Sequence, residues 1–384
     1  MKLAIVTHFP KDPEKPKGGV EVVSVNLVKE LANFKDLDIH VITQDFSNSI
    51  IDISSWHGVT VHRLPGIKGN KLINAIGRGR RQISNYLLNL APHVVHAHDT
   101  YGLMVKGLRI PRVFTIHGFI YADTRVSKTK WAWIRSKIWR WIETRGWADQ
   151  PHIISISPHV REHLSGISRG VIHDIDNPIS DEFFEIPRGE KKGVIFSASV
   201  ICPRKNTLAL IEAFGKLVKD GMEAELRLSG AITEPHYGQL VQERIKKEDV
   251  IGKVSLLGWI STEHFMEELA NASIFALVSL EENSPLGIAE AMAAGVPVVT
   301  SNRCGMPYMV RHGETGFLVN PIDTCDIAKR LKLLLEEDSL RVDMGEKSRA
   351  VALDRYRPST ISKRTRAVYY EVCGIEENSV ENKF

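Results

Sequence analysis

Short runs of apolar, often β-branched residues alternate with longer stretches in which apolar residues recur every three or four positions. The short runs predict β-strands and the longer stretches predict amphipathic helices. In the first half, strands are expected at 2–7, 38–43, 93–98, 112–116, 152–156 and 171–173, with helices near 20–34, 71–90, 127–147 and 159–165. In the second half, strands are expected near 193–198, 224–229, 254–258, 273–279 and 297–300, with helices near 206–219, 235–247, 261–271, 285–294, 323–336, 338–353 and 359–373.

This alternation of strands and helices is typical of parallel sheets with crossover helices, and it starts anew in the second half. The segment 177–192 between the two series is rich in proline, glycine and charged residues, which indicates a boundary. The length of 384 residues also suits two domains. We therefore expect a Rossmann-like domain over residues 1–180 and a second over residues 190–355.

The composition is that of an ordinary globular protein, with 43% hydrophobic and 25% charged residues. A net charge of +4 does not by itself indicate a nucleic-acid binder. No stretch approaches the ~20 apolar residues of a membrane-spanning helix, and the apolar run at residues 3–6 is too short for a signal peptide. The four cysteines are widely spaced, which favours a reduced, cytoplasmic protein without a cysteine metal site.

Tryptophan is concentrated in one segment, because residues 131–147 hold five of the seven tryptophans. Basic residues surround them at 128, 130, 135, 137, 140 and 145, and Glu143 is the one acid among them. This mixture is typical of a helix that lies on an anionic membrane, so peripheral contact through 127–147 is one interpretation. In the alternative, the apolar face of the helix packs against the first sheet. That face is formed by Trp131, Ile134, Ile138, Trp141 and Ile142.

The segment 282–290, Glu-Asn-Ser-Pro-Leu-Gly-Ile-Ala-Glu, follows a predicted strand and enters a predicted helix. Pro285 suits the first turn of that helix, since its missing N–H would have no partner there. Backbone N–H groups of Leu286, Gly287 and Ile288 would then face an anion such as a diphosphate. Glu282 could contact sugar hydroxyls and Glu290 ribose hydroxyls, although two glutamates at this spacing also fit a solvent-exposed helix.

Other polar residues follow predicted strands. Gly18 and Gly19 precede a helix, where glycine tolerates a positive φ and allows a ligand to approach closely. Lys205, with Arg204 beside it, could offset charge on a departing diphosphate. His96, His98 and Asp99 could line an acceptor site or bind a metal, and the second reading lacks further ligands. Asp174 and Asp176 come just before the boundary segment 177–192 and are interpreted as linker residues.

Together these segments resemble glycosyltransferase family 4. Residues 282–290 and the following Ala-Met-Ala-Ala-Gly-Val-Pro are similar to its E-x7-E signature, and Pro203-Arg-Lys-Asn206 is similar to its phosphate-binding lysine segment. Gly18-Gly-Val-Glu21 and further segments at 93–99, 115–118, 155–157 and 313–319 match in order. Two positions depart from the family pattern, Val200 where an arginine is common and Tyr308 where many members have glutamate.

The resemblance implies a GT-B architecture, in which two Rossmann-like domains face each other across a cleft and a final helix, near 356–375, returns to the first domain. It implies a nucleotide-sugar donor in the C-terminal domain, an acceptor in the N-terminal domain, and transfer with retention of configuration. His117, Lys205 and Glu282 would be catalytic. The substrate-binding residues would be Gly18, Gly19, Arg204, Gly258, Pro285, Leu286, Gly287, Ile288 and Glu290.

The expected function is transfer of a hexosyl or N-acetylhexosaminyl group from a nucleotide-diphospho-sugar to a glycan, lipid-linked or phosphorylated acceptor. UDP is the favoured nucleotide, with no metal, cofactor or nucleic acid involved. The expected location is the cytoplasm, including the inner face of the membrane. Two alternatives stay open, a nucleotide-sugar 2-epimerase and a non-catalytic nucleotide-sugar binder.

Overall fold

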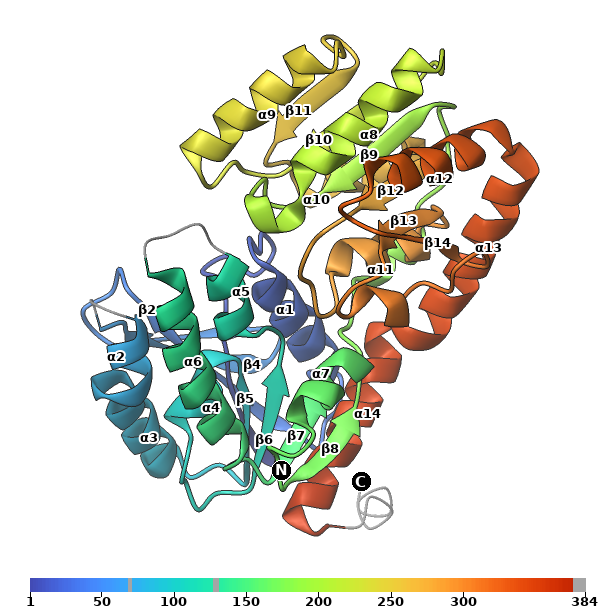
Figure 1. Cartoon of the computed structure of the whole chain (residues 1–384). Helices are drawn as coiled ribbons and strands as arrows, with labels where there is room; N and C mark the ends of the chain where they lie inside the picture. The colour runs from blue at the N-terminus through green and yellow to red at the C-terminus, as the bar shows by residue number, and fades with distance from the viewer. Residues whose placement is uncertain (68–70, 127–130, 376–384) are drawn as a thin grey trace. The chain divides into compact units, whose positions relative to one another are not determined.

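The computed structural model describes residues 1–67, 71–126 and 131–375, which form two compact α/β units. The first unit contains Met1–Tyr121, Trp133–Pro178 and the last helix, α14 (Pro358–Cys373), coloured red in Figure 1. The second contains Ile179–Arg357, and residues 122–126 and 131–132 group with it. The two sheets predicted from the sequence are therefore present, and the C-terminal helix belongs to the first unit.

The first unit is built on an eight-stranded sheet with the order β3-β4-β2-β1-β5-β6-β7-β8. All neighbouring strands are parallel except β3 and β4. The strands are β1 (Lys2–Val6), β2 (Asp38–Asp45), β3 (Asp52–Trp56), β4 (Val59–Pro65), β5 (Val94–His98), β6 (Arg112–Ile116), β7 (His152–Ser155) and β8 (Val171–Asp174). The helices are α1 (Gly19–Leu31), α2 (Lys71–Ile76), α3 (Arg78–Leu90), α4 (Thr100–Met104), α6 (Ala132–Trp147), α7 (Pro158–Leu164) and α14, while α5 (Ile120–Val126) spans the boundary between the two groupings.

The second unit is built on a parallel six-stranded sheet with the order β11-β10-β9-β12-β13-β14. Its strands are β9 (Val194–Ala198), β10 (Glu225–Ser229), β11 (Val254–Gly258), β12 (Ile274–Leu277), β13 (Val298–Ser301) and β14 (Gly316–Val319). Its helices are α8 (Thr207–Lys219), α9 (Pro235–Lys247), α10 (Thr262–Asn271), α11 (Leu286–Ala293), α12 (Thr324–Glu336) and α13 (Asp338–Arg355). Three short 3₁₀ turns complete it, η1 (Asp181–Phe184), η2 (Pro203–Lys205) and η3 (Met306–Tyr308).

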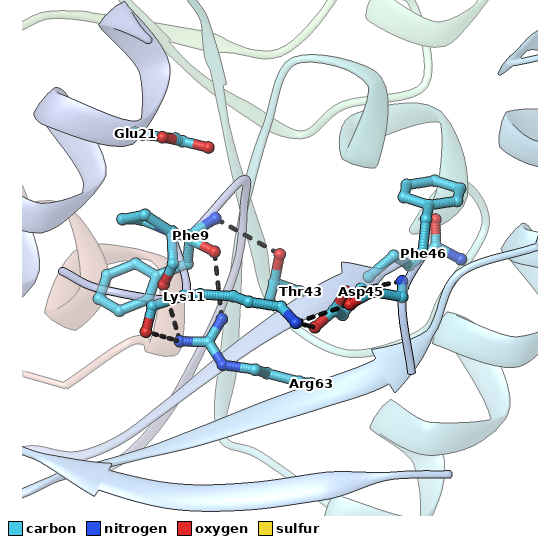
Figure 2. A pocket seen from close by; sticks show the side chains of 10 residues that line it. Phe9, Lys11, Glu21, Thr43, Asp45, Phe46 and Arg63 are labelled. Atoms are coloured by element: carbon cyan, nitrogen blue, oxygen red, sulfur yellow. Dashed lines mark hydrogen bonds and ion pairs between the residues drawn. The ribbon is translucent and has the colours of Figure 1, made fainter. Parts of the chain in front are cut away.

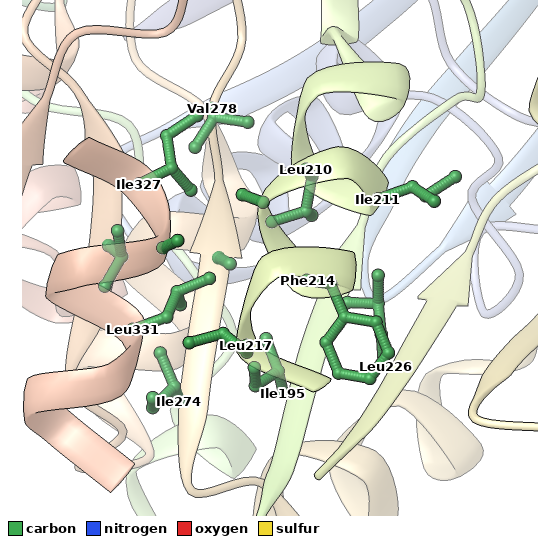
Figure 3. Packing of buried hydrophobic residues seen from close by; sticks show 14 of the residues in the cluster. Ile195, Leu210, Ile211, Phe214, Leu217, Leu226, Ile274, Val278, Ile327 and Leu331 are labelled. Atoms are coloured by element: carbon green, nitrogen blue, oxygen red, sulfur yellow. The ribbon is translucent and has the colours of Figure 1, made fainter. Parts of the chain in front are cut away.

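The second sheet is covered on both faces, as its apolar central strands β9 and β12 require. Successive side chains of a strand point to opposite faces. Ile195 and Ile274 accordingly join one core cluster, whereas Phe196 and Phe275 join the other. Figure 3 shows the first cluster, in which side chains of α8 and α12 pack against β9 and β12. Because both faces are filled, the ends of the strands are the places where this unit can bind a ligand.

The observed elements correct several sequence-based expectations. The strands β3 and β4 and the helices α4 and α5 were not predicted, and the expected helix at 71–90 is two helices, α2 and α3. Residues 316–319, for which no strand was expected, form the edge strand β14. The expected helix at 127–147 begins at Ala132 in the structure, and residues 127–130 lie outside the described part of the chain. Among the described residues, no helix is both long and apolar enough to cross a membrane.

Candidate active site

In the second sheet the strand order reverses between β9 and β12. The chain continues from β9 outward to β10 and β11, and then returns to place β12 on the other side of β9. Open parallel sheets bind ligands outside the carboxyl ends of the strands at such a reversal. The loop after β9 carries Arg204 and Lys205, and the loop after β12 carries Glu282. Three of the predicted site residues therefore come from the two loops at this point.

The three side chains form one ion-pair cluster. Nη1 of Arg204 lies 2.9 Å from Oε1 of Glu282, and Nζ of Lys205 contacts the same oxygen. The Lys205 and Glu282 side chains are only 10% and 11% exposed, and Arg204 is 26% exposed and also lies 3.4 Å from the half-exposed Asp123. Burial tends to lower the pKa of Arg204, but Glu282 and Asp123 outweigh it and raise the pKa. Two cations converge on one carboxylate oxygen, at a place where a diphosphate oxygen could replace it.

Backbone hydrogen bonds hold the two loops together. Leu280 N–H donates to the carbonyl of Arg204 (2.8 Å), and the side-chain amide of Asn206 donates to the carbonyls of Val278 (3.1 Å) and Pro321 (2.7 Å). Asn206 itself has φ 59°, a left-handed conformation that asparagine tolerates well. These contacts fix Lys205 relative to Glu282. The sequence placed Asn206 in the motif without indicating this role.

Gly305 supports Glu282 from behind, and sequence reasoning missed it. Its N–H donates to the carbonyl of Glu282 at 2.8 Å. A Cβ at this position would lie 1.6 Å from the carbonyl oxygen of Asn283, so no side chain fits there without moving the loop. The sequence signal, one glycine after a strand, is too weak to have revealed this contact.

The start of α11 differs in detail from the expectation. Pro285 precedes the helix as an extended N-cap residue (φ −68°, ψ 122°) instead of occupying its first turn. The N–H of Ile288 donates to the carbonyl of Pro285 at 3.1 Å, so the expected contribution of Ile288 to anion binding is wrong for this conformation. Leu286 and Gly287 lie in the first turn of α11, where backbone N–H groups have no acceptor within the helix. A Cβ on Gly287 would lie 3.6 Å from the carbonyl oxygen of Ala198, which places this helix start against the end of β9.

Glu290 lies on the buried side of α11 and is only 9% exposed. Burial disfavours its charged form and raises the pKa of this carboxyl to about 8. The alternative of two solvent-exposed glutamates is therefore wrong, because Glu282 is also largely buried. A carboxyl whose pKa is strongly raised by burial is a candidate functional residue.

Three other positions in this unit were named from the sequence, Gly258, Val200 and Tyr308, and none of them is part of the ion-pair cluster. Gly258 ends β11, two strands from β9, with φ 67°, and its carbonyl accepts from Gly230 N–H at 2.7 Å. Val200 is 41% exposed. The carbonyl of Tyr308 accepts from Arg355 at 2.8 Å. Of these three, only Gly258 was expected to bind substrate, and the structure does not bring it together with Lys205.

His117 belongs to the first unit, at the carboxyl end of β6. Its backbone N–H donates to Oδ1 of Asp99 (2.9 Å), and its Nε2 shares a hydrogen bond with Nδ1 of His98 (2.8 Å). Burial lowers the pKa of His117, although Asp99 and a hydrogen bond with Asn177 oppose this effect. The imidazole is thus held neutral near pH 7, which suits a hydrogen-bonding role better than a proton-transfer role.

His96 and His98 do not form the polar wall that the sequence suggested. They are 0% and 1% exposed. His96 Nδ1 shares a hydrogen bond with the Tyr369 hydroxyl of α14, and its Nε2 shares one with the Thr115 hydroxyl, each at 2.7 Å. His96 therefore joins the last helix to the interior of the first unit. Asp174 also has a structural contact, an ion pair with Arg161 at 2.7 Å.

A pocket of about 480 Å³ lies in the first unit near the carboxyl ends of β1, β2 and β4 (Figure 2). Charged side chains of both signs line it, namely Lys11, Glu21, Asp45 and Arg63. The buried Arg63 donates to the carbonyls of Phe9 (3.2 Å) and Pro10 (2.7 Å), which ties the loop after β1 to β4. Lys11 lies at 3.3 Å from Asp45 across the pocket.

Gly18 and Gly19 also lie in the first unit, at the start of α1. The expected positive φ is not observed at Gly18. Gly18 has φ −135° and ψ 154°, which any residue adopts. No heavy atom lies within 4 Å of the place where its Cβ would be, so the space beside it is open to a ligand.

Known proteins resemble this chain over both units. A family model described as Glycosyltransferase Family 4 matches residues 17–183, and one described as Glycosyl transferases group 1 matches residues 178–351. The chain is 25% identical to the N-acetyl-alpha-D-glucosaminyl L-malate synthase of Bacillus anthracis, over 98% of this chain and 99% of that protein.

Solved structures show the same fold over nearly the whole chain. Sucrose-phosphate synthase from Thermosynechococcus elongatus superposes with a TM-score of 0.80 at 18% identity, covering 97% of this chain and 99% of that one. The Anabaena protein HepE in complex with UDP-glucose superposes with a TM-score of 0.73 at 16% identity, covering 97% and 100%. Together the two family models span residues 17–351, with each sheet matched by one of them. The chain therefore belongs to glycosyltransferase family 4 and is a glycosyltransferase with the GT-B fold.

Proposed function

We propose that the second unit binds a nucleotide-diphospho-sugar and that the enzyme transfers its hexosyl or N-acetylhexosaminyl group with retention of configuration. The observation that carries this proposal is the cluster of Arg204, Lys205 and Glu282 at the strand reversal between β9 and β12. In the structure, the Glu282 carboxylate pairs with both cations. A bound diphosphate would compete for them and free the carboxylate to accept from sugar hydroxyls.

These residues would act mainly by stabilising the leaving group, the nucleoside diphosphate. The bond between the anomeric carbon and the diphosphate oxygen breaks, and its electron pair stays on that oxygen. Lys205, Arg204 and the N–H groups of Leu286 and Gly287 would stabilise this charge. The acceptor hydroxyl then attacks from the same face, and its proton passes to the departing diphosphate. This front-face route requires no carboxylate nucleophile and no metal.

Two similar proteins support the choice of donor. The HepE structure holds UDP-glucose, and the Bacillus anthracis relative is named for transfer of an N-acetylglucosaminyl group. We therefore propose a UDP-sugar, in preference to a GDP- or ADP-sugar.

We propose that the acceptor binds to the first unit, in the pocket lined by Lys11, Glu21, Asp45 and Arg63. Carboxylates accept hydrogen bonds from sugar hydroxyls, and Lys11, with a 63% exposed side chain, can contact a phosphate. The pocket thus suits a glycan, including a phosphorylated or lipid-linked one. We place the enzyme in the cytoplasm, at the inner face of the membrane.

A thermal-shift panel of UDP-, GDP- and ADP-sugars tests the donor proposal. At a ligand concentration of 100 Kd, specific binding stabilises the native state by about 2.7 kcal/mol, which raises Tm by a few degrees. We expect UDP-sugars to give the largest shift, unchanged by EDTA. Equal shifts for all three nucleotides, or none, would contradict the proposal.

UDP-N-acetylglucosamine incubated without acceptor should stay unepimerised, and release of a 2-epimer would favour the isomerase alternative.

A further inference from the structure

The helix α6 exposes three large apolar side chains, although Trp147 at its end is buried. Trp133, Ile138 and Trp141 are 60%, 46% and 56% exposed. The sequence-based alternative, in which the face containing Ile138 and Trp141 packs against the first sheet, is therefore wrong for these residues. Exposed tryptophans on one side of a helix form an apolar surface that water solvates poorly, and such a surface marks an interaction site.

The buried side of the same helix contains Ser136, Glu143, Gly146 and Trp147. Glu143, only 5% exposed, accepts from the backbone N–H groups of Ile120 (3.0 Å) and Tyr121 (2.9 Å), and the Ser136 hydroxyl donates to the Tyr121 carbonyl (2.7 Å). A Cβ on Gly146 would lie 2.3 Å from Cδ2 of Leu103, so the helix lies close against its neighbour. These contacts fix the rotation of α6. The tryptophans cannot turn inward without removing Glu143 from its hydrogen bonds.

Only positive charge accompanies the exposed tryptophans. Lys137 lies over the Trp133 ring, 4.8 Å from its centroid, and Arg145 lies over the Trp141 ring at 4.1 Å. Arg140 is also exposed, and the one acid within Ala132–Trp147 is the buried Glu143. Because residues four apart share a helical face, the residues 133, 137, 141 and 145 form a continuous row of alternating indole rings and cations.

We propose that this row, together with Ile138 and Arg140, docks the enzyme on an anionic phospholipid surface. Indole rings favour the boundary between headgroups and acyl chains, and Lys and Arg side chains favour anionic headgroups. A protein partner could also cover exposed tryptophans, but a row without an exposed carboxylate matches a surface of uniform negative charge better. Docking here does not depend on the identity of the donor, so it is tested separately from the proposed transfer.

The first test measures co-sedimentation of the whole chain with vesicles. We expect binding to vesicles containing phosphatidylglycerol at low salt, and little binding to pure phosphatidylcholine. Trp133→Ser combined with Trp141→Ser should weaken the binding about tenfold or more, since both indoles leave the interface. Trp259→Ala is the matched control, because this tryptophan is 58% exposed but lies in the second unit, and its vesicle binding should be unchanged.

The second test separates local charge from net charge. Lys137→Glu with Arg140→Glu should weaken binding by roughly 30-fold or more, whereas Lys246→Glu with Lys247→Glu on α9 makes the same change in net charge at an exposed site elsewhere and should have little effect. Unchanged circular dichroism and an unchanged thermal shift with UDP-sugar would show that each variant is folded. Failure of the intact chain to bind anionic vesicles at low salt, or equal binding by both charge variants, would overturn the proposal.

Discussion

Replacing Lys205 by alanine is expected to lower the rate of sugar transfer by about 10²–10³-fold, the usual effect of removing one group that stabilises charge in the transition state. Lys205 is the most buried cation of the cluster, so water cannot readily substitute for its charge. Because Glu282 keeps its 2.9 Å contact with Arg204, the variant should stay folded. The measurement is kcat and KM with a UDP-sugar, alongside the thermal unfolding of the free protein.

Glu282→Ala gives a contrasting result that tests the same arrangement. It should also lose transfer, because the carboxylate no longer contacts the sugar. Its affinity for UDP should be kept or increased, since the diphosphate no longer competes with Glu282 for the two cations. Lys205→Ala, in contrast, should bind UDP more weakly. Lys332→Ala is the control, because Lys332 forms an ion pair with Asp220 on the surface of the same unit. Near-normal turnover in both site variants would show that the cluster is not the catalytic site.

The site motifs could be predicted because each follows a buried strand, and buried strands are the clearest signal in the sequence. Val194–Ala198 and Ile274–Leu277 are apolar throughout or nearly so, which places Lys205 and Glu282 just beyond their carboxyl ends. The strand order, by contrast, cannot be predicted from any local sequence pattern. It is the adjacency of β9 and β12 that brings these two residues together, although they are 77 positions apart.

The sequence-based predictions were wrong where tertiary contacts, which a local pattern does not encode, decide the structure. The strand β3 is mostly exposed and polar, so its composition resembles a loop; it is revealed only by its pairing with β4 through the tight turn at His57 and Gly58. His96 and His98 alternate like residues of a ligand-facing strand, yet both are buried, and Tyr369 of α14 bonds to His96. On α6, Trp133, Ile138 and Trp141 are exposed and Glu143 is buried, because that carboxylate accepts hydrogen bonds from the start of α5.

Glu290→Gln should remove a pH dependence of donor binding that the native enzyme shows. In the free protein, burial holds the pKa of Glu290 at about 8, so this carboxyl is largely protonated at pH 7. Ribose hydroxyls that donate to it would favour the ionised form, and donor binding would then release a proton. The association constant should therefore rise with pH, by at most about tenfold per pH unit below pH 8, and level off above it. Titration calorimetry with a UDP-sugar, whose diphosphate does not titrate in this range, measures it.

The same carboxyl has an opposite effect on the stability of the free protein. Its folded pKa of about 8 lies above its ordinary value of 4.5, so the folded state holds this proton more tightly. The free energy of unfolding should consequently fall as pH rises from 4.5 to 8, and the Gln variant should lack this part of the decrease. The difference between the native protein and the variant isolates Glu290 from other titrating groups. If the two proteins show parallel pH profiles in both donor binding and unfolding, Glu290 neither carries the raised pKa nor contacts the ribose.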